Sequence, residues 1–212
     1  MTQQAEHAAI EACLKALHTA TIADVYDEKE WPAPALDPEI GFRTGRPGER
    51  LAGFAYTVEG ALAADRRGPD ARKERWVQAA PEGSVAVWSG TNARGTCLFG
   101  DGLAGKMHDR GCRGMVADGG YRDHDGLQAM GLPVFARYAS PVQSLNRWYV
   151  TRTQEPVVLP AAVGGTITVR PGDWILADGD GVVVIGAEAI LEVLERAEAF
   201  EAEEAGHGTP NS

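Results

Sequence analysis

Two aspartates and an arginine stand at the edges of predicted regular structure between Gly100 and Asp123. Asp101 lies in the run Gly-Asp-Gly-Leu-Ala-Gly, and after twenty intervening residues Arg122 and Asp123 follow. Each falls where a predicted strand leads into a helix, and ligand sites of open α/β sheets lie at such connections. A carboxylate can hold a divalent cation, and a guanidinium binds two oxygens of an anion in one plane. The segment therefore indicates an active site for an anionic substrate.

The glycines of this segment allow a second interpretation. Residues 100–105 match the dinucleotide fingerprint G-x-G-x-x-G, with Asp118 available as the ribose-binding acid. The match is poor, because the fingerprint follows the first strand of a βαβ unit and only residues 97–99 precede it here. Glycines at a helix start still leave backbone N–H groups free to bind a carboxylate or phosphate. Taken alone, the two aspartates and the arginine would be a helix cap and a surface ion pair.

The elements that must position these residues alternate between strands and helices. A turn is expected at Gly119-Gly120, and Gly131 is expected to end the helix that follows it. The expected order is a strand at 84–88, a helix at 100–110, a strand at 114–117, a helix at 124–130 and a strand at 132–136. The two strand-to-helix connections should meet, which brings the charged residues together.

Two short helices are expected at the start of the chain. Apolar residues recur at helical spacing within residues 2–17, and Thr21 with Asp24 resembles a capping box that opens the second helix. Residues 31–50, rich in proline and glycine, predict an extended loop, and residues 51–58 then alternate like a strand.

The C-terminal part has a different pattern, which predicts a compact antiparallel unit. Short β-rich runs separated by glycine turns lie at 157–159, 166–169, 174–177 and 182–185. A last helix is expected over 187–204, with one apolar face opposed by seven glutamates, and residues 206–212 are expected to be a disordered tail. The charged residues 65–75 predict a solvated loop and helix face.

The composition fits one globular domain over residues 1–205. The chain has 212 residues, 44% of them hydrophobic, and a net charge of −10 that argues against nucleic acid or an anionic membrane as a partner. No apolar run approaches the ~20 residues that span a bilayer, and the N-terminus does not resemble a signal peptide, so we expect a cytoplasmic protein. Reduced core thiols are expected for the three cysteines, Cys13, Cys97 and Cys112.

Several segments resemble one known family. The runs Gly-Asp-Gly-Leu-Ala at 100–104 and Gly-Met-Val-Ala-Asp-Gly-Gly-Tyr-Arg-Asp at 114–123 are similar to the family of regulator of ribonuclease activity A and its relatives, the 4-hydroxy-4-methyl-2-oxoglutarate aldolases. The resemblance covers roughly residues 19–205, with further matching segments at 131–136, 163–173 and 177–184. It implies a single α/β domain of the swivelling ββα type, with a mixed sheet and helices packed on it.

The resemblance also implies a role for each site residue. Asp123 would hold a divalent cation, Mg²⁺ or Mn²⁺, and Arg122 would grip the 2-oxo and carboxylate oxygens of the substrate. Asp101 would position a water that protonates the product enolate. The backbone amides of Gly102 and Leu103 would receive the substrate carboxylate. The catalytic branch of the family carries all three charged residues, as does this chain.

The chemistry of pyruvate release makes independent sense of these residue types. Cleaving a C–C bond beside a 2-oxo acid leaves a pyruvate enolate, whose negative oxygen needs a fixed positive partner. A divalent cation can be that partner when one carboxylate and several waters hold it. Decarboxylation of oxaloacetate forms the same enolate. We therefore expect a metal-dependent lyase acting on a 4-hydroxy-2-oxo acid, with oxaloacetate decarboxylation as a side or main activity.

Other residues near this segment could take part. Lys106 could form a Schiff base, although a solvent-facing helix position is the ordinary role of such a lysine. His108 and His124 could be ligands or bases, but neither belongs to a ligand-spaced pair. Asp118 could cap the expected glycine turn or border the site.

A group of arginines follows the last expected strand of the βαβ part. Arg137, Arg147 and Arg152, with Trp148 and Tyr149 among them, could bind a second carboxylate of the substrate. Arginine beside aromatic residues is equally typical of a subunit interface.

The resemblance implies a homotrimer or a hexamer, with the site near a subunit boundary. A glutamate of the last helix could then reach a neighbouring metal site, the candidates being Glu192, Glu195 and Glu198. Ser89-Gly90 stands where family members often place an acidic residue, and together with the charged insertion it leaves the natural substrate open. The alternative function is a non-enzymatic regulator that binds a ribonuclease or another protein through its acidic surface.

Overall fold

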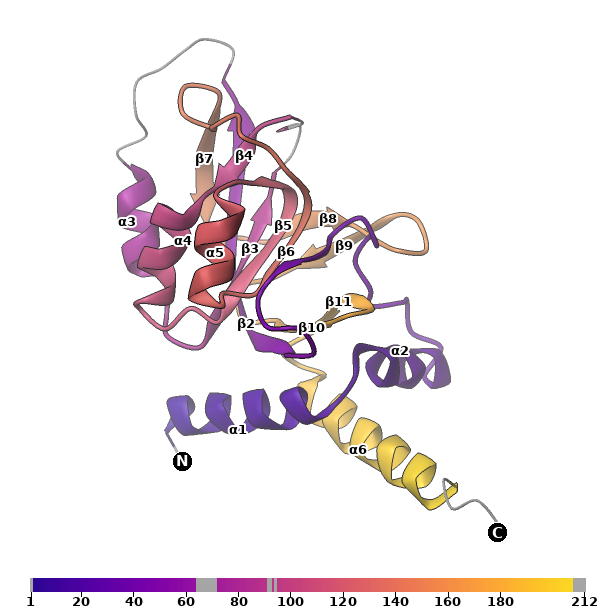
Figure 1. The fold of residues 1–212 in the computed structure, drawn as a ribbon. Coiled ribbons are helices and arrows are strands. Elements are labelled where there is room, and N and C mark those ends of the chain that lie inside the picture. Colours follow the sequence, from indigo (N-terminus) through magenta and orange to yellow (C-terminus); the bar gives the residue numbers. More distant parts are fainter. Residues whose placement is uncertain (1, 64–71, 91–92, 94, 208–212) are drawn as a thin grey trace.

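The computed structural model describes residues 2–63, 72–90, 93 and 95–207, and its centre is a nine-stranded mixed sheet (Figure 1). The order along the main path is β1-β6-β5-β3-β2-β10-β11, with β4 added beside β5 and β7 beside β2. The strands are β1 Gly41–Thr44, β2 Leu51–Leu62, β3 Ser84–Ser89, β4 Cys97–Phe99, β5 Gly114–Tyr121, β6 Val134–Ala139, β7 Trp148–Thr153, β10 Trp174–Asp178 and β11 Gly181–Ile185. Strands β8 Val157–Pro160 and β9 Thr166–Val169 form a separate antiparallel pair.

Helices cover the sheet in two groups (Figure 1). Helices α3, α4 and α5 lie on one face of the parallel strands, whereas α1, α2 and α6 lie at the end formed by β10 and β11. The helices are α1 Gln3–Ala16, α2 Thr19–Glu28, α3 Arg72–Ala79, α4 Asp101–His108, α5 His124–Met130 and α6 Ile190–His207. Strands β2, β3, β5 and β6 are mutually parallel, as β4 is to β5. The expected α/β domain of the swivelling ββα type, with helices packed on a mixed sheet, is confirmed.

Alternation along the central strands divides the core into separate layers. In β3, Ala86 and Trp88 pack under α3, α4 and α5, while Val85 and Val87 face a second cluster on the other side of the sheet. A third cluster joins α1, α2 and α6 to β10 and β11. Every residue of β3 is buried, and between the two terminal serines the strand is a continuous apolar run, as expected of a central parallel strand.

The expected turn at Gly119-Gly120 is wrong, because β5 continues through both glycines to Tyr121. Neither glycine has a positive φ. Their function is close packing: a Cβ on Gly120 would lie 2.6 Å from the Thr96 carbonyl oxygen and 2.4 Å from the Tyr138 ring. Glycine at this position lets the Thr96 carbonyl, just before β4, and the Tyr138 side chain of β6 approach β5.

Other boundaries also differ from the expectation. The second helix starts at Thr19, so Thr21 and Asp24 lie inside it and form no capping box. The expected loop 31–50 contains β1, which pairs with β6, and β7 was not anticipated. The predicted separate antiparallel unit at the C-terminal end is only partly present. Strands β8 and β9 form a pair of their own, but β10 pairs with β2 and so belongs to the main sheet.

The first part of the charged insertion and the residues after the last helix lie outside the described part of the chain. Helix α6 runs to His207, so residues 206 and 207, expected in the tail, are helical, and residues 208–212 lie outside the described part of the chain. Residues 65–71 of the charged insertion (65–75) lie outside it as well, and α3 begins directly after them. Among the described residues, no helix combines the length and apolar character needed to cross a membrane.

Replacing Gly120 by alanine should destabilise the fold, because the added Cβ meets a backbone oxygen that cannot move freely. We expect Gly120→Ala to lower the free energy of unfolding by about 1–3 kcal/mol, as overpacking does. Gly179→Ala is the matched control, since nothing lies within 4 Å of its Cβ position. Urea unfolding checks both variants, and equal stability of the two would contradict the packing role of Gly120.

Candidate active site

Two neighbouring strands deliver the charged residues to one edge of the sheet. Strand β4 ends at Phe99 and leads through Gly100 into α4, while β5 ends at Tyr121 and leads through Arg122 into α5. The strands are parallel, and the Arg122 N–H donates to the Phe99 carbonyl at 3.1 Å. The predicted meeting of the two strand-to-helix connections is thus confirmed in position.

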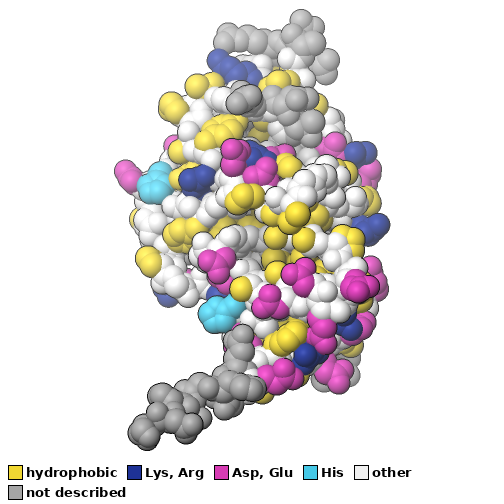
Figure 2. Space-filling view, turned by 90° about the vertical axis from the view of Figure 1, so that its right-hand side faces the viewer, with side chains coloured by type: hydrophobic (Ala, Val, Ile, Leu, Met, Phe, Trp, Pro, Cys, Tyr) yellow, Lys and Arg dark blue, Asp and Glu magenta, His cyan; other side chains and the backbone are white. Residues whose placement is uncertain are grey.

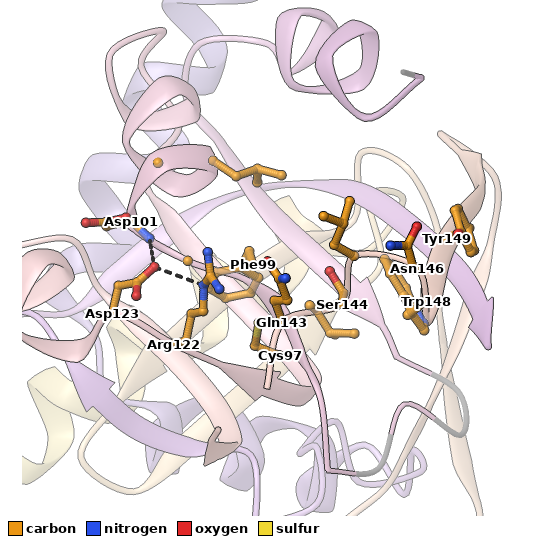
Figure 3. Close-up of a pocket in the computed structure, with 15 residues that line it drawn as sticks. Cys97, Phe99, Asp101, Arg122, Asp123, Gln143, Ser144, Asn146, Trp148 and Tyr149 are labelled. Atoms are coloured by element: carbon orange, nitrogen blue, oxygen red, sulfur yellow. Dashed lines mark hydrogen bonds and ion pairs between the residues drawn. The ribbon is translucent and has the colours of Figure 1, made fainter. Parts of the chain in front are cut away.

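The Asp123 carboxylate lies at the start of α4. Its Oδ2 accepts from the Asp101 N–H at 3.4 Å and lies 3.2 Å from Arg122 Nε (Figure 3). Asp123 is also the N-cap residue of α5, with a left-handed backbone of φ 60° and ψ 46°. A Cβ on Gly100 would lie only 2.2 Å from this oxygen. Glycine at 100 is therefore required for the approach of the carboxylate.

The Asp101 carboxylate lies against the other helix. It points away from Asp123 (Figure 3), and its Oδ2 is 2.8 Å from the position that a Cβ on Gly126 would occupy, in the first turn of α5. The Asp123 carboxylate thus lies at the start of α4, and the Asp101 carboxylate lies at the start of α5. The partial positive charge of a helix start stabilises a carboxylate there.

A cavity of about 310 Å³ opens beside these residues. Asp101, Arg122 and Asp123 line it together with Gly102 and Leu103. In the described part of the chain, the N–H groups of these last two residues have no hydrogen-bond acceptor, as is usual in a first helical turn. The cavity thus presents a guanidinium and two backbone donors to an anion.

The donor set of the cavity fits a hydrated hard cation. The described residues contain no group of three or more His, Cys, Asp and Glu side chains that could enclose a metal ion. Asp123, whose side chain is 36% exposed, offers one carboxylate beside the cavity. Mg²⁺ and Mn²⁺ bind through one or two carboxylates and keep several waters, whereas a structural zinc site needs four protein ligands.

The other residues considered around this segment lie outside the cavity. Lys106 forms an ion pair with Glu74 at the surface. His108 Nδ1 lies 3.4 Å from the Cys112 carbonyl oxygen, and His124 Nδ1 lies 2.8 Å from the Tyr121 hydroxyl. The dinucleotide interpretation gains nothing, because Gly105 has only ordinary contacts and is not required for close helix packing.

The three candidate arginines do not line the cavity either. Arg152 pairs with Glu59, and the Arg147 guanidinium donates to the carbonyl oxygens of Gln143 and Leu145, at 3.3 Å and 3.5 Å. Trp148 and Tyr149 do line it, from β7. So do Gln143, Ser144, Leu145 and Asn146 of the preceding loop, which sequence reasoning missed because they follow no strand or helix periodicity.

Arg137 is the centre of a separate charge cluster. It pairs with Asp118, Asp37 and Glu39 beside a second cavity of about 740 Å³. Burial alone would lower the pKa of Arg137, but hydrogen bonds to Asp118 and Asp37 raise it overall. The Glu39 backbone N–H lowers the pKa of Asp37 most, and Arg137 adds to this against an opposing effect of burial. Asp118 is therefore a structural partner of Arg137.

This cluster should make stability depend on pH. The folded pKa of Asp37 lies below its ordinary value of 3.8, so its contribution is present above pH 3.8 and is lost as the pH falls through the folded pKa. Arg137→Gln should cost about 1–3 kcal/mol at neutral pH, and the difference should shrink below pH 3.8. Arg152→Gln, in a more exposed pair, should cost much less. Urea unfolding at pH 7 and pH 3 checks this, and a pH-independent difference would contradict it.

Comparison with known proteins places the chain among similar sequences and folds. A protein of Xanthomonas campestris pv. campestris named "Putative 4-hydroxy-4-methyl-2-oxoglutarate aldolase" is 32% identical over 168 residues, which cover 77% of this chain and 96% of the relative. The Legionella pneumophila protein DlpA is 27% identical over 84% of this chain, which spans only 28% of DlpA.

The fold has solved counterparts. Streptomyces coelicolor RraAS2, described as an unusual member of the RNase ES inhibitor RraA protein family, superimposes with a TM-score of 0.77. The match covers 94% of this chain and 95% of that one at 23% identity, and so bears on the fold alone. The family profile described as "RraA-like: Aldolase/RraA" matches residues 19–184. The chain therefore belongs to the RraA-like family.

Proposed function

We propose that this protein is a divalent-metal-dependent lyase, a class II pyruvate aldolase, that cleaves a 4-hydroxy-2-oxo acid and releases pyruvate. The observation that carries the proposal is the meeting of Asp101, Arg122 and Asp123 with two unbonded helix amides at one cavity. Relatives that carry the name "Putative 4-hydroxy-4-methyl-2-oxoglutarate aldolase" support the reaction class. Assembly as a homotrimer or hexamer stays a prediction.

The residues of the chain divide the work between binding and proton transfer. Arg122 Nε is held by Asp123, which leaves both terminal nitrogens of the guanidinium for the 2-oxo and carboxylate oxygens of the substrate. The amides of Gly102 and Leu103 receive the same carboxylate. Asp101 positions the water that supplies a proton.

The bond changes follow from this placement. The C4 hydroxyl gives its proton to the water held by Asp101 and becomes a carbonyl as the C3–C4 bond breaks, and the electron pair of that bond moves into a pyruvate enolate. A proton delivered at C3 through the water on Asp101 then gives the methyl group of pyruvate. Asp123 would hold Mg²⁺ or Mn²⁺, which supplies Lewis-acid stabilisation of the developing negative charge. Decarboxylation of oxaloacetate passes through the same enolate and is a second expected reaction.

A regulator that binds another protein is the alternative function. Acidic side chains gather on the lower part of the face shown in Figure 2. Several glutamates of that end are already paired within the chain, including Glu192 with Lys29 and Glu28 with Arg196. The complete set of three charged residues at the cavity favours the lyase.

Pyruvate release tests the proposal directly. The purified protein should release pyruvate from at least one member of a panel of 4-hydroxy-2-oxo acids and oxaloacetate, and EDTA should abolish release until Mg²⁺ or Mn²⁺ is added. Asp123→Ala should lower metal-dependent turnover by at least about 100-fold. Lys106→Met should retain turnover, because this lysine pairs with Glu74 away from the cavity. Release that resists EDTA, or that needs Lys106, would contradict the metal mechanism.

Gly100 provides a test of the site geometry. The Cβ of Gly100→Ala would collide with the Asp123 carboxylate and the Arg122 side chain, so turnover should fall at least about tenfold with little loss of stability. Gly105→Ala in the same helix is the control, since its Cβ makes only ordinary contact with Met130. Steady-state rates with thermal unfolding measure both effects, and a fully active Gly100→Ala enzyme would rule out the proposed arrangement.

A further inference from the structure

The connection between β5 and α5 consists of Arg122 and Asp123, and both residues line the cavity. Backbone hydrogen bonds hold its two ends. The Arg122 N–H donates to the Phe99 carbonyl at 3.1 Å, and the Leu127 N–H donates to the Asp123 carbonyl at 3.1 Å. In the described part of the chain, the Arg122 carbonyl and the Asp123 N–H have no hydrogen-bond partner. The backbone bonds of the connection therefore do not fix the peptide group between these two residues.

The orientation of that peptide group decides where the Asp123 carboxylate points. Asp123 has a left-handed backbone, with φ 60° and ψ 46°, which is unfavourable for a residue with a Cβ, although aspartate tolerates it better than most. In this conformation Asp123 Oδ2 lies 3.4 Å from the Asp101 nitrogen and 3.2 Å from Arg122 Nε. Helix α5 has only seven residues, too few to be stable alone, so its start needs support from outside the helix.

A side-chain contact bridges the connection and supplies this support. Tyr121 is the last residue of β5 and His124 is the first residue of α5, and the Tyr121 hydroxyl lies 2.8 Å from His124 Nδ1. The tyrosine is firmly held, because it is only 2% exposed and its carbonyl accepts from the Ser140 N–H at 2.8 Å. The contact thus ties the first turn of α5 to the end of β5, across Arg122 and Asp123.

We propose that Tyr121 and His124 are positioning residues, whose hydrogen bond holds Asp123 in the left-handed conformation that aims its carboxylate at the start of α4. Neither residue is among the described residues that line the cavity, so both act on the site through Asp123. This inference rests on the proposed function, in which Asp123 holds the divalent cation. It also gives His124 a role other than that of a ligand or base.

Mn²⁺ binding in the absence of substrate tests the inference, because electron paramagnetic resonance measures free Mn²⁺ directly. Tyr121→Phe keeps the buried ring and removes the hydroxyl, and His124→Ala removes the imidazole from an exposed position. Each variant should raise the Kd of Mn²⁺ at least about fivefold, since loss of a supporting contact loosens a metal ligand. The double variant should bind no more weakly than the weaker single variant, because both changes remove the same bond.

Two further variants separate positioning from other roles. His124→Asn, whose amide oxygen takes the place of Nδ1, should keep the Kd within about twofold of the wild-type value. Tyr56→Phe is the matched control, because it also removes a buried hydroxyl, one that donates to the Trp76 carbonyl at 2.8 Å, and it should leave the Kd unchanged. Urea unfolding shows that each variant is folded in the assay.

Three results would overturn the inference and leave the proposed function intact. They are a wild-type Kd in Tyr121→Phe, losses that multiply in the double variant, and a His124→Asn variant that binds as weakly as His124→Ala. The last result would mean that the imidazole itself is required. A wild-type protein that binds no Mn²⁺ would overturn the proposed function, and the inference with it.

Discussion

The contact between the Asp123 carboxylate and the start of α4 is the constraint on which the candidate site depends. It joins the connection after β5 to the connection after β4, and it holds Arg122 by its Nε atom. Three local features permit it: the absent Cβ of Gly100, the left-handed backbone of Asp123 and the parallel pairing of β4 with β5. All three are properties of the backbone. The backbone conformation therefore does most to position the charged side chains.

The parts of the molecule that sequence reasoning predicted are those governed by local periodicity. The buried run of β3 and the two short helices of the site have clear patterns. The three charged residues were located by their place where predicted strands lead into helices, and the family resemblance gave each of them a role. Glycine was the main source of error. At Gly119-Gly120 it serves close packing between strands, and nothing in a single sequence distinguishes that role from a turn.

Long-range pairing accounts for the rest of what was missed. Strand β1 exists because β6 is available beside it, and β7 because β2 extends past residue 58. The loop 143–146 follows no strand or helix periodicity, and only the fold shows that it lines the same cavity as Arg122. Arg137 pairs with Asp37 and Glu39, and Arg152 pairs with Glu59, all of which lie 93 to 100 positions away in sequence.

The two halves of the cavity come from different kinds of backbone. The half that carries the charged residues is built from strand ends and helix starts, so a change of the backbone there displaces the groups that carry the chemistry. The half formed by residues 143–146 is a loop without regular secondary structure, in which Gln143 and Leu145 are exposed and Ser144 is buried. Substitutions in that loop can therefore accumulate without loss of the fold. Within such a family, diversification of substrates is expected to proceed through this loop while the reaction stays the same.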